Sequence, residues 1–279
     1  MRDWGERYAA VEARRTARSA APLERVRTLA DRTDGANLRA IGNAWSRAAF
    51  DGPFFETPPD GAFSMGVVFV QSREGDTATR NPASLGGGSV DEQLIYEGLS
   101  RVAADAVVAG AATLHADALF TVWRPELVEL RLARNLPRHP AQVVMSADGS
   151  VKPDELLLFN VPDVPVYVLT SSAGRERLAA ALEPRPWVEV VTGGSLPEQF
   201  ARLRDAGIQR GCSVGGRHAA TALVDAGLVK DVYLTKTQVS GGEPGTPWYV
   251  GRRRVELRTV LVKEWQGDHG VVRFDHGVL

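Results

Sequence analysis

The stretch at residues 212–235 constrains the fold more than any other part of the sequence. A short apolar run ends at Gly215 and Gly216, an amphipathic helical pattern follows, and a second apolar run begins at residue 232. This order predicts a strand, a tight glycine turn, a helix and another strand. Glycine lets bare backbone approach a ligand, and the free amide groups of the following helix suit a phosphate. An isolated glycine pair, however, more often only turns the chain.

The same alternation of strand and helix extends back to residue 65. Strands are predicted at residues 65–70, 104–109, 142–145, 166–169 and 187–191, and helices at residues 91–102, 126–136 and 175–182 and after Ser195. Residues 257–264 and 271–274 are predicted to form an antiparallel hairpin. This pattern favours an α/β fold with a mostly parallel sheet, an antiparallel C-terminal hairpin and helices on both faces.

The first sixty residues have a different pattern. Residues 2–50 are rich in Ala and Arg, with apolar residues at helical spacing and a break at residues 31–35. A connection rich in Pro and Gly follows at residues 52–61. We therefore expect an N-terminal helical arm and linker at residues 1–60, packing on the main body or on a partner subunit, and a main domain at residues 61–279.

Composition excludes several classes of function. The formal net charge of -1 provides no basic field for nucleic acid. No apolar run approaches the roughly 20 residues that span a membrane, and the charged start does not fit a secretory signal, so a cytoplasmic protein is expected. The only cysteine, Cys212, cannot form an internal disulfide or supply the cysteine ligands of a zinc deaminase. The histidines have no metal-ligand spacing, and no metal site is predicted.

Small and hydroxyl-bearing residues follow every predicted parallel strand. These residues are Ser72, then Gly110, Ala111, Ala112 and Thr113, then Ser146, Thr170 with Ser171, Gly193, and Gly215 with Gly216; the charged residues Glu74 and Arg217 stand beside the first and the last of them. Ligands of such sheets bind at the carboxyl ends of the strands. A long ligand with phosphates would explain the repetition, although the same residue types are common in loops. Neither the Rossmann fingerprint nor the P-loop signature is present, so a dinucleotide would bind through another fold.

Three segments resemble the dihydrofolate-reductase-like family of riboflavin-pathway pyrimidine reductases, which forms the C-terminal domain of bifunctional deaminase-reductases. They are ADAVVAGAAT at residues 104–113, the Gly215-Gly216 pair, and ALVDAGLVKD at residues 222–231. SREG at residues 72–75 is similar to the family's Ser-x-Asp-Gly. The resemblance extends from residue 65 to the C-terminus. It implies a dihydrofolate-reductase-like fold, NADPH as hydride donor, a pyrimidine ribosyl phosphate as substrate, and a homodimer.

The resemblance also implies roles for individual residues. The cofactor pyrophosphate would lie on Gly215, Gly216 and Arg217, with further cofactor contacts at residues 110–113 and at Ser146, Thr170 and Gly193. Arg175 or Arg177 would meet a 2′-phosphate. Hydride transfer also needs a proton source, for which Ser72 and Glu74 are the candidate catalytic residues at the substrate, with His115 as a further candidate.

The chain departs from the family mainly on the substrate side. Val68 and Val214 stand where the family carries polar or acidic residues, and Glu74 stands where it carries Asp. The run that the family uses for its phosphorylated substrate is replaced by HADAL at residues 115–119. Two functions therefore remain open. One is an NADPH-dependent reductase of a pyrimidine, pteridine-like or similar heterocycle, and the alternative is a non-catalytic nucleotide-binding or regulatory protein that retains the fold.

Overall fold

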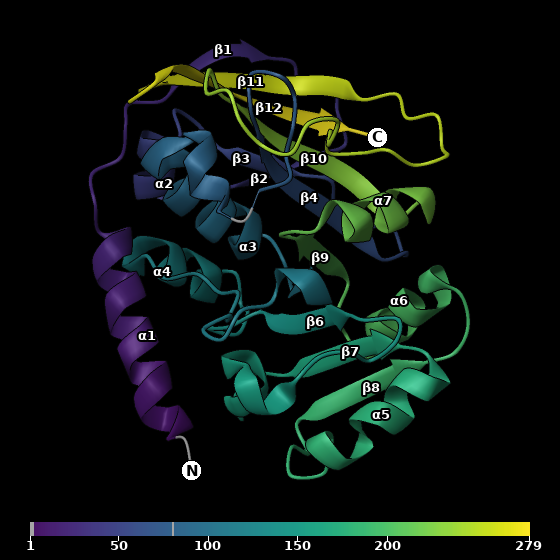
Figure 1. The fold of residues 1–279 in the computed structure, drawn as a ribbon. Helices are drawn as coiled ribbons and strands as arrows, with labels where there is room; N and C mark the ends of the chain where they lie inside the picture. The colour runs from purple at the N-terminus through teal and green to yellow at the C-terminus, as the bar shows by residue number, and fades with distance from the viewer. Residues whose placement is uncertain (1–2, 80) are drawn as a thin grey trace.

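A single ten-stranded sheet forms the centre of the computed structural model, which describes residues 3–79 and 81–279 (Figure 1). Its strands are β1 (Arg27–Asp31), β4 (Ser64–Gln71), β5 (Ala106–Gly110), β6 (Ala141–Met145), β7 (Val166–Thr170), β8 (Val188–Thr192), β9 (Arg210–Ser213), β10 (Val229–Lys236), β11 (Arg258–Gly267) and β12 (Gly270–Val278). The strand order is β1-β11-β12-β10-β4-β9-β5-β6-β7-β8. The strands from β10 to β8 are parallel, and those from β1 to β10 are antiparallel, as the sequence predicts for the C-terminal hairpin.

Helices cover both faces of this sheet (Figure 1). They are α1 (Trp4–Ser19), α2 (Ala44–Ala49), the π-helical η2 (Val90–Leu99), α3 (Ser100–Val102), α4 (Pro125–Ala133), α5 (Ser172–Leu182), α6 (Leu196–Asp205) and α7 (Arg217–Asp225), with short 3-10 turns η1 (Pro82–Leu85), η3 (Ala111–Thr113), η4 (Pro153–Glu155) and η5 (Leu157–Asn160). Successive residues of β5 belong to different cores: Val107 is in the same core as Leu94 of η2, whereas Val108 is in the same core as Leu223 of α7. Both faces of the central strands are therefore buried, which explains their continuous apolar runs.

The expected helical arm is only partly correct. Helix α1 is present, but residues 27–31 form β1, which pairs with β11 at the edge of the main sheet. A small second sheet of β2 (Arg39–Ile41) and β3 (Phe54–Glu56) and the short α2 complete this region. Residues 27–31 form a strand because pairing with the free backbone groups of β11 stabilises them more than the weak helical spacing near residue 27 would stabilise a helix. The expected start at residue 2 lies outside the described residues, and the division of the chain at residue 60 stays a prediction.

The helix expected at residues 91–102 is bent rather than continuous. Gly98 has φ -118° and ψ -109°, which are not helical values. A Cβ atom at Gly98 would lie 2.6 Å from the backbone oxygen of Gln93 and 2.8 Å from Leu127 of α4. Glycine therefore permits both the bend and the close approach of α4.

A buried ionic network joins the small sheet to the main one. Arg210, at the start of β9, lies 2.6 Å from Glu56 of β3 and 2.9 Å from Asp231 of β10, and His276 of β12 lies 2.8 Å from Asp231. Each of these side chains is at most 3% exposed. Burial alone would raise the pKa of Asp231, but His276 and Arg210 lower it to about 2. The network lies at the amino end of β9, away from the edge where ligands are expected.

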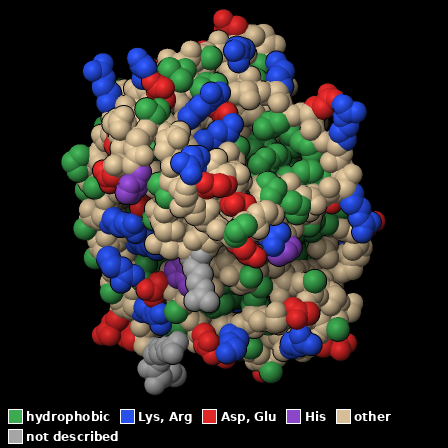
Figure 2. Space-filling view, turned by 45° about the horizontal axis from the view of Figure 1, so that its top comes forward, with side chains coloured by type: hydrophobic (Ala, Val, Ile, Leu, Met, Phe, Trp, Pro, Cys, Tyr) green, Lys and Arg blue, Asp and Glu red, His purple; other side chains and the backbone are tan. Residues whose placement is uncertain are grey.

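The surface carries mixed charges. Figure 2 shows basic and acidic side chains interspersed over one face of the molecule, as expected for a net charge of -1. Within the described part of the chain, no helix is both long enough and apolar enough to cross a membrane.

Candidate functional site

The predicted ligand positions lie along one edge of the sheet. Because β10, β4, β9, β5, β6, β7 and β8 are parallel, their carboxyl ends meet at the same edge. In spatial order, the residues at or just after these ends are Thr237, then Ser72 with Glu74, then Gly215 with Gly216 and Arg217, then Gly110, Ala111, Ala112 and Thr113, then Ser146, then Thr170 with Ser171, and finally Gly193. The fold thus places segments that are far apart in the sequence on adjacent strands.

The Gly215-Gly216 pair follows the short central strand β9. The last pair between β9 and β4 joins Ser213 to Val67, and β4 then continues beyond this point. The chain therefore leaves the sheet between the ends of β4 and β5. A Cβ atom on Gly215 would lie 2.7 Å from Cγ2 of Thr113 in the turn after β5, and Gly216 has φ +79°. Gly215 thus lies close against the Thr113 side chain, Gly216 has a backbone conformation that favours glycine, and bare backbone lies at the centre of the edge.

Helix α7 begins directly after this pair and leaves its first amide groups without a side-chain cap. Its first turn also contains no acidic residue. In contrast, Ser171 caps α5, and Ser195 and Glu198 form the predicted capping box of α6. The half-buried Arg217 forms no ion pair with any residue that the structure describes. Free amides, the positive end of the helix and a free guanidinium together fit a pyrophosphate.

The hydroxyl groups further along the edge serve mainly to build their own loops. Ser146 is 4% exposed, and its Oγ accepts a hydrogen bond from the amide of Ser150 at 3.1 Å. Thr170 is 3% exposed, and a Cβ atom on Gly174 would lie 1.9 Å from its Oγ1. Gly193, with φ +75°, is exposed and has open space around it. A ligand at these positions would meet backbone, and the predicted contacts of Ser146 and Thr170 with a cofactor stay predictions.

The two arginines on α5 differ in their partners. Arg177 donates a hydrogen bond to the backbone oxygen of Asp148 at 2.6 Å and lies 3.5 Å from its carboxylate. Arg175 is exposed and has no ion pair with a described residue. Of the two, Arg175 is the one free to meet a 2′-phosphate.

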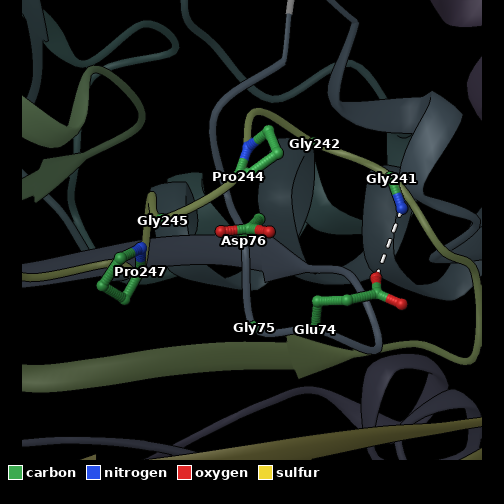
Figure 3. A pocket seen from close by; sticks show the side chains of 8 residues that line it. All are labelled: Glu74, Gly75, Asp76, Gly241, Gly242, Pro244, Gly245 and Pro247. Carbon is green, nitrogen blue, oxygen red and sulfur yellow. Dashed lines mark hydrogen bonds between the residues drawn. The ribbon is translucent and has the colours of Figure 1, made fainter.

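A cavity of about 610 Å³ lies where the loops after β4 and β10 meet (Figure 3). It is lined by Glu74, Gly75, Asp76, Gly241, Gly242, Pro244, Gly245 and Pro247. Ser72 is 1% exposed, and its Oγ accepts a hydrogen bond from the amide of Asp76 at 3.2 Å. The Asp76 carboxylate in turn accepts one from the amide of Thr246 at 2.8 Å. These two side chains therefore hold the loops that form the cavity.

Glu74 is an exposed carboxylate at this cavity. It accepts hydrogen bonds from Oγ of Ser240 at 2.9 Å and from the amide of Gly241 at 3.4 Å, the latter drawn in Figure 3. These donors, with Ser240 first, lower the pKa of Glu74 to about 2. At neutral pH Glu74 is thus ionised. It can orient a substrate by accepting a hydrogen bond, but it holds no proton to deliver.

A buried carboxyl group on η2 was not expected from the sequence. Asp91 is 9% exposed and lies beside Thr235, near the carboxyl end of β10. Burial raises the pKa of Asp91 to about 7, Glu92 acts in the same direction, and the Thr235 hydroxyl opposes them. Such a group can both hold and release a proton at neutral pH. The available signal was an acidic residue three and four positions before Leu94 and Ile95, on their buried helix face.

The remaining predicted residues lie elsewhere. His115 does not line the cavity and is exposed, although its ring is partly desolvated. This partial desolvation and the charge of Arg15 lower the pKa of His115. Val68 and Val214 are each 3% exposed and belong to the core on the η2 side. The hydroxyl of Tyr96 on η2 donates a hydrogen bond to the backbone oxygen of Val214 at 3.0 Å. The two valines therefore pack as core residues next to the edge.

The arrangement of strands and helices defines an α/β class of fold, and comparison with solved structures shows which proteins share it. The parallel body, antiparallel C-terminal hairpin and two helical layers confirm the expected fold class. It is the fold of the pyrimidine reductases of riboflavin biosynthesis. No protein-family profile and no curated protein matches the sequence.

Three solved structures illustrate this likeness. A pyrimidine reductase-like protein from Corynebacterium diphtheriae is 18% identical with a TM-score of 0.61, and the match covers 77% of this chain and 92% of that one. The riboflavin biosynthesis reductase of Saccharomyces cerevisiae is 15% identical with a TM-score of 0.52, covering 80% and 93%. A diaminohydroxyphosphoribosylaminopyrimidine deaminase/5-amino-6-(5-phosphoribosylamino)uracil reductase from Thermotoga maritima is 16% identical with a TM-score of 0.57. That match covers 78% of this chain but only 57% of the Thermotoga chain.

Proposed function

We propose that this protein is an NADPH-dependent reductase of a heterocyclic substrate, either a pyrimidine ribosyl phosphate or a pteridine-like compound. The observation that carries the proposal is the uncapped start of α7 behind Gly215 and Gly216, at the centre of the carboxyl edge. The three solved structures with this fold are named as reductases or as reductase-like, which supports the same reaction class. A cytoplasmic homodimer is part of the proposal.

The described residues fit the cofactor, and two carboxyl groups would provide proton exchange and orientation of the substrate. The amides after Gly216 and the guanidinium of Arg217 would hold the pyrophosphate, and residues 110–113 would lie alongside it. NADPH, when bound, supplies the hydride. Asp91 would hold a ring nitrogen of the substrate and exchange a proton with it, because its pKa lies near neutrality. Glu74, ionised, would orient a polar group of the substrate at the cavity of Figure 3.

Cofactor binding is tested by titrating the purified protein with NADPH and following nicotinamide fluorescence. Gly216→Asp places a negative charge and a side chain at the proposed pyrophosphate position, so we expect NADPH affinity to fall at least a hundredfold, about 2.7 kcal/mol. Gly35→Asp is the matched control: Gly35 is exposed, has φ +72° and has no atom within 4 Å of an added Cβ. Wild-type protein that fails to bind at high micromolar NADPH, or a Gly216→Asp variant with unchanged affinity, contradicts the proposal.

The buried Val68 and Val214 favour one alternative, a non-catalytic nucleotide-binding or regulatory protein. This alternative predicts NADPH binding without turnover. Steady NADPH oxidation in the presence of any pyrimidine or dihydropteridine of a substrate panel, lost in Asp91→Asn, would decide for the reductase.

A further inference from the structure

Three consecutive glycines before η2 lie at the meeting point of distant parts of the chain. A Cβ atom on Gly86 would lie 2.6 Å from Val239, in the loop after β10. One on Gly87 would lie 2.6 Å from both Cβ and Oδ2 of Asp91, and one on Gly88 would lie 2.6 Å from Oε1 of Glu24. Each of the three glycines therefore lies against a different neighbour, and a side chain at any of them would displace that neighbour.

Glu24, from the N-terminal region, caps the helix that carries Asp91. Its Oε1 accepts a hydrogen bond from the amide of Ser89 at 3.0 Å, and its Oε2 accepts one from the amide of Val90 at 2.9 Å and one from Oγ of Ser89 at 2.6 Å. No side chain within the helix supplies a cap of its own. Burial alone would raise the pKa of Glu24, but these hydrogen bonds lower it below its ordinary value. The first turn of η2 is thus held by a carboxylate more than sixty positions away in the sequence.

The same segment is also fixed by the C-terminal hairpin. Nε1 of Trp265 on β11 donates a hydrogen bond to the backbone oxygen of Gly87 at 3.0 Å. Gly87 is thereby held against Asp91 while Glu24 holds the adjoining amides of Ser89 and Val90. The position of the Asp91 carboxyl relative to Thr235 therefore depends on two elements that do not line the cavity of Figure 3.

We infer that Glu24 is a positioning residue of the active site, which holds η2 so that the Asp91 carboxyl stays buried beside Thr235. The N-terminal region is then part of the catalytic unit rather than a separable arm. This inference rests on the proposed function of Asp91. It predicts that a substitution of Glu24 changes the pKa of Asp91 but does not change NADPH binding at Gly215 and Gly216.

The test compares Glu24→Gln with Glu12→Gln in the full-length protein. Glu12 lies in the same N-terminal region but contacts Tyr8 and Arg138 instead of η2. Carboxyl NMR of ¹³C-labelled aspartate, assigned with Asp91→Asn, measures the pKa of Asp91, and amide hydrogen exchange reports on Ser89 and Val90. In Glu24→Gln we expect at least tenfold faster exchange of both amides and a pKa of Asp91 shifted towards the ordinary aspartate value. Glu12→Gln should match the wild type in both.

NADPH affinity separates this inference from the proposed function. We expect the NADPH affinity of Glu24→Gln to lie within twofold of the wild-type affinity, because Glu24 lies outside the proposed cofactor site at Gly215 and Gly216. If the wild type binds no NADPH, the proposed function fails, while the NMR and exchange measurements still report on Glu24. If Glu24→Gln does not fold, Glu24→Asp keeps the charge with a shorter side chain and should show the same changes to a smaller extent. Unchanged exchange and an unchanged pKa of Asp91 in a folded Glu24 variant would overturn the inference.

Discussion

At the scale of single residues, environment gives two carboxyl groups near the carboxyl edge opposite properties. Glu74 is exposed and held as an anion by Ser240, with a pKa of about 2. Asp91 is buried on η2, with a pKa of about 7. Pairs of acids whose pKa values are pushed apart in this way are typical of sites that need one anion and one proton carrier.

Asp91 should lower the stability of the protein at neutral and alkaline pH. Its folded pKa of about 7 lies above the ordinary 3.8, so between these values the folded chain keeps a proton that the unfolded chain has released. Its contribution therefore falls as the pH rises through this window. Asp91→Asn should raise the free energy of unfolding by roughly 2–4 kcal/mol at pH 8 and change it little at pH 4. Urea denaturation at the two pH values checks this.

The control for this prediction is Asp34→Asn, which alters an exposed aspartate. It should have almost no effect at either pH. An Asp91→Asn variant with equal effects at pH 4 and pH 8 would show that the carboxyl group is not destabilised by burial. Loss of NADPH oxidation together with a gain in stability would fit a residue kept for function.

At the scale of elements, buried ions join strands that the chain order keeps apart. Arg210 connects β9 to β3 and β10 through Glu56 and Asp231. Because the pKa of Asp231 is lowered to about 2, its contribution to stability is present above its ordinary pKa of 3.8 and is lost as the pH falls towards 2. Acid should therefore loosen the contact between the small sheet and the main sheet.

Arg210→Met should be strongly destabilising. It leaves the carboxylates of Glu56 and Asp231, both 0% exposed, without their shared cation. Removing one partner of a buried ion pair costs roughly 3–5 kcal/mol. Arg204→Met, at an arginine that is 40% exposed and pairs with Asp205, should cost at most about 0.5 kcal/mol. Denaturant unfolding at pH 7 measures both, and equal costs would argue against the network.

At the scale of the whole molecule, the N-terminal region closes one edge of the sheet. β1 pairs with β11 from Arg27↔Glu264 to Asp31↔Leu261. Helix α1 is held to the body by ion pairs at partly exposed positions, such as Arg7 with Asp117 and Arg18 with Glu92. The strand therefore protects an edge, whereas the helix adds contacts that salt will weaken.

Two truncations should separate these contributions. Removing residues 1–32 exposes the edge of β11, so we expect a lower melting temperature and association beyond the state of the full-length protein. Removing residues 1–18 keeps β1 and Glu24 and should cause only a modest loss of stability without new association. Light scattering coupled to size-exclusion chromatography, over a range of concentrations, measures the difference. Identical behaviour of the two variants would show that β1 does not protect the sheet.

The order and type of most elements and the position of the glycine turn could be predicted from local sequence patterns. Apolar periodicity, the capping box at Ser195 and the pair Gly215-Gly216 are local signals, and the structure places the corresponding strands and helices within a few residues of the prediction. The alternation of strands and helices was also sufficient to predict a parallel sheet. The carboxyl ends of its strands were therefore expected at one edge.

Which side chains can take part in chemistry at that edge depends on contacts between distant parts of the chain. The raised pKa of Asp91 depends on burial between η2 and β10, and the cap on η2 depends on Glu24 far away in the sequence. β1 became a strand because the edge of β11 was open to it. Burial, charge pairing and strand pairing are properties of neighbours in space, so local patterns could not reveal them.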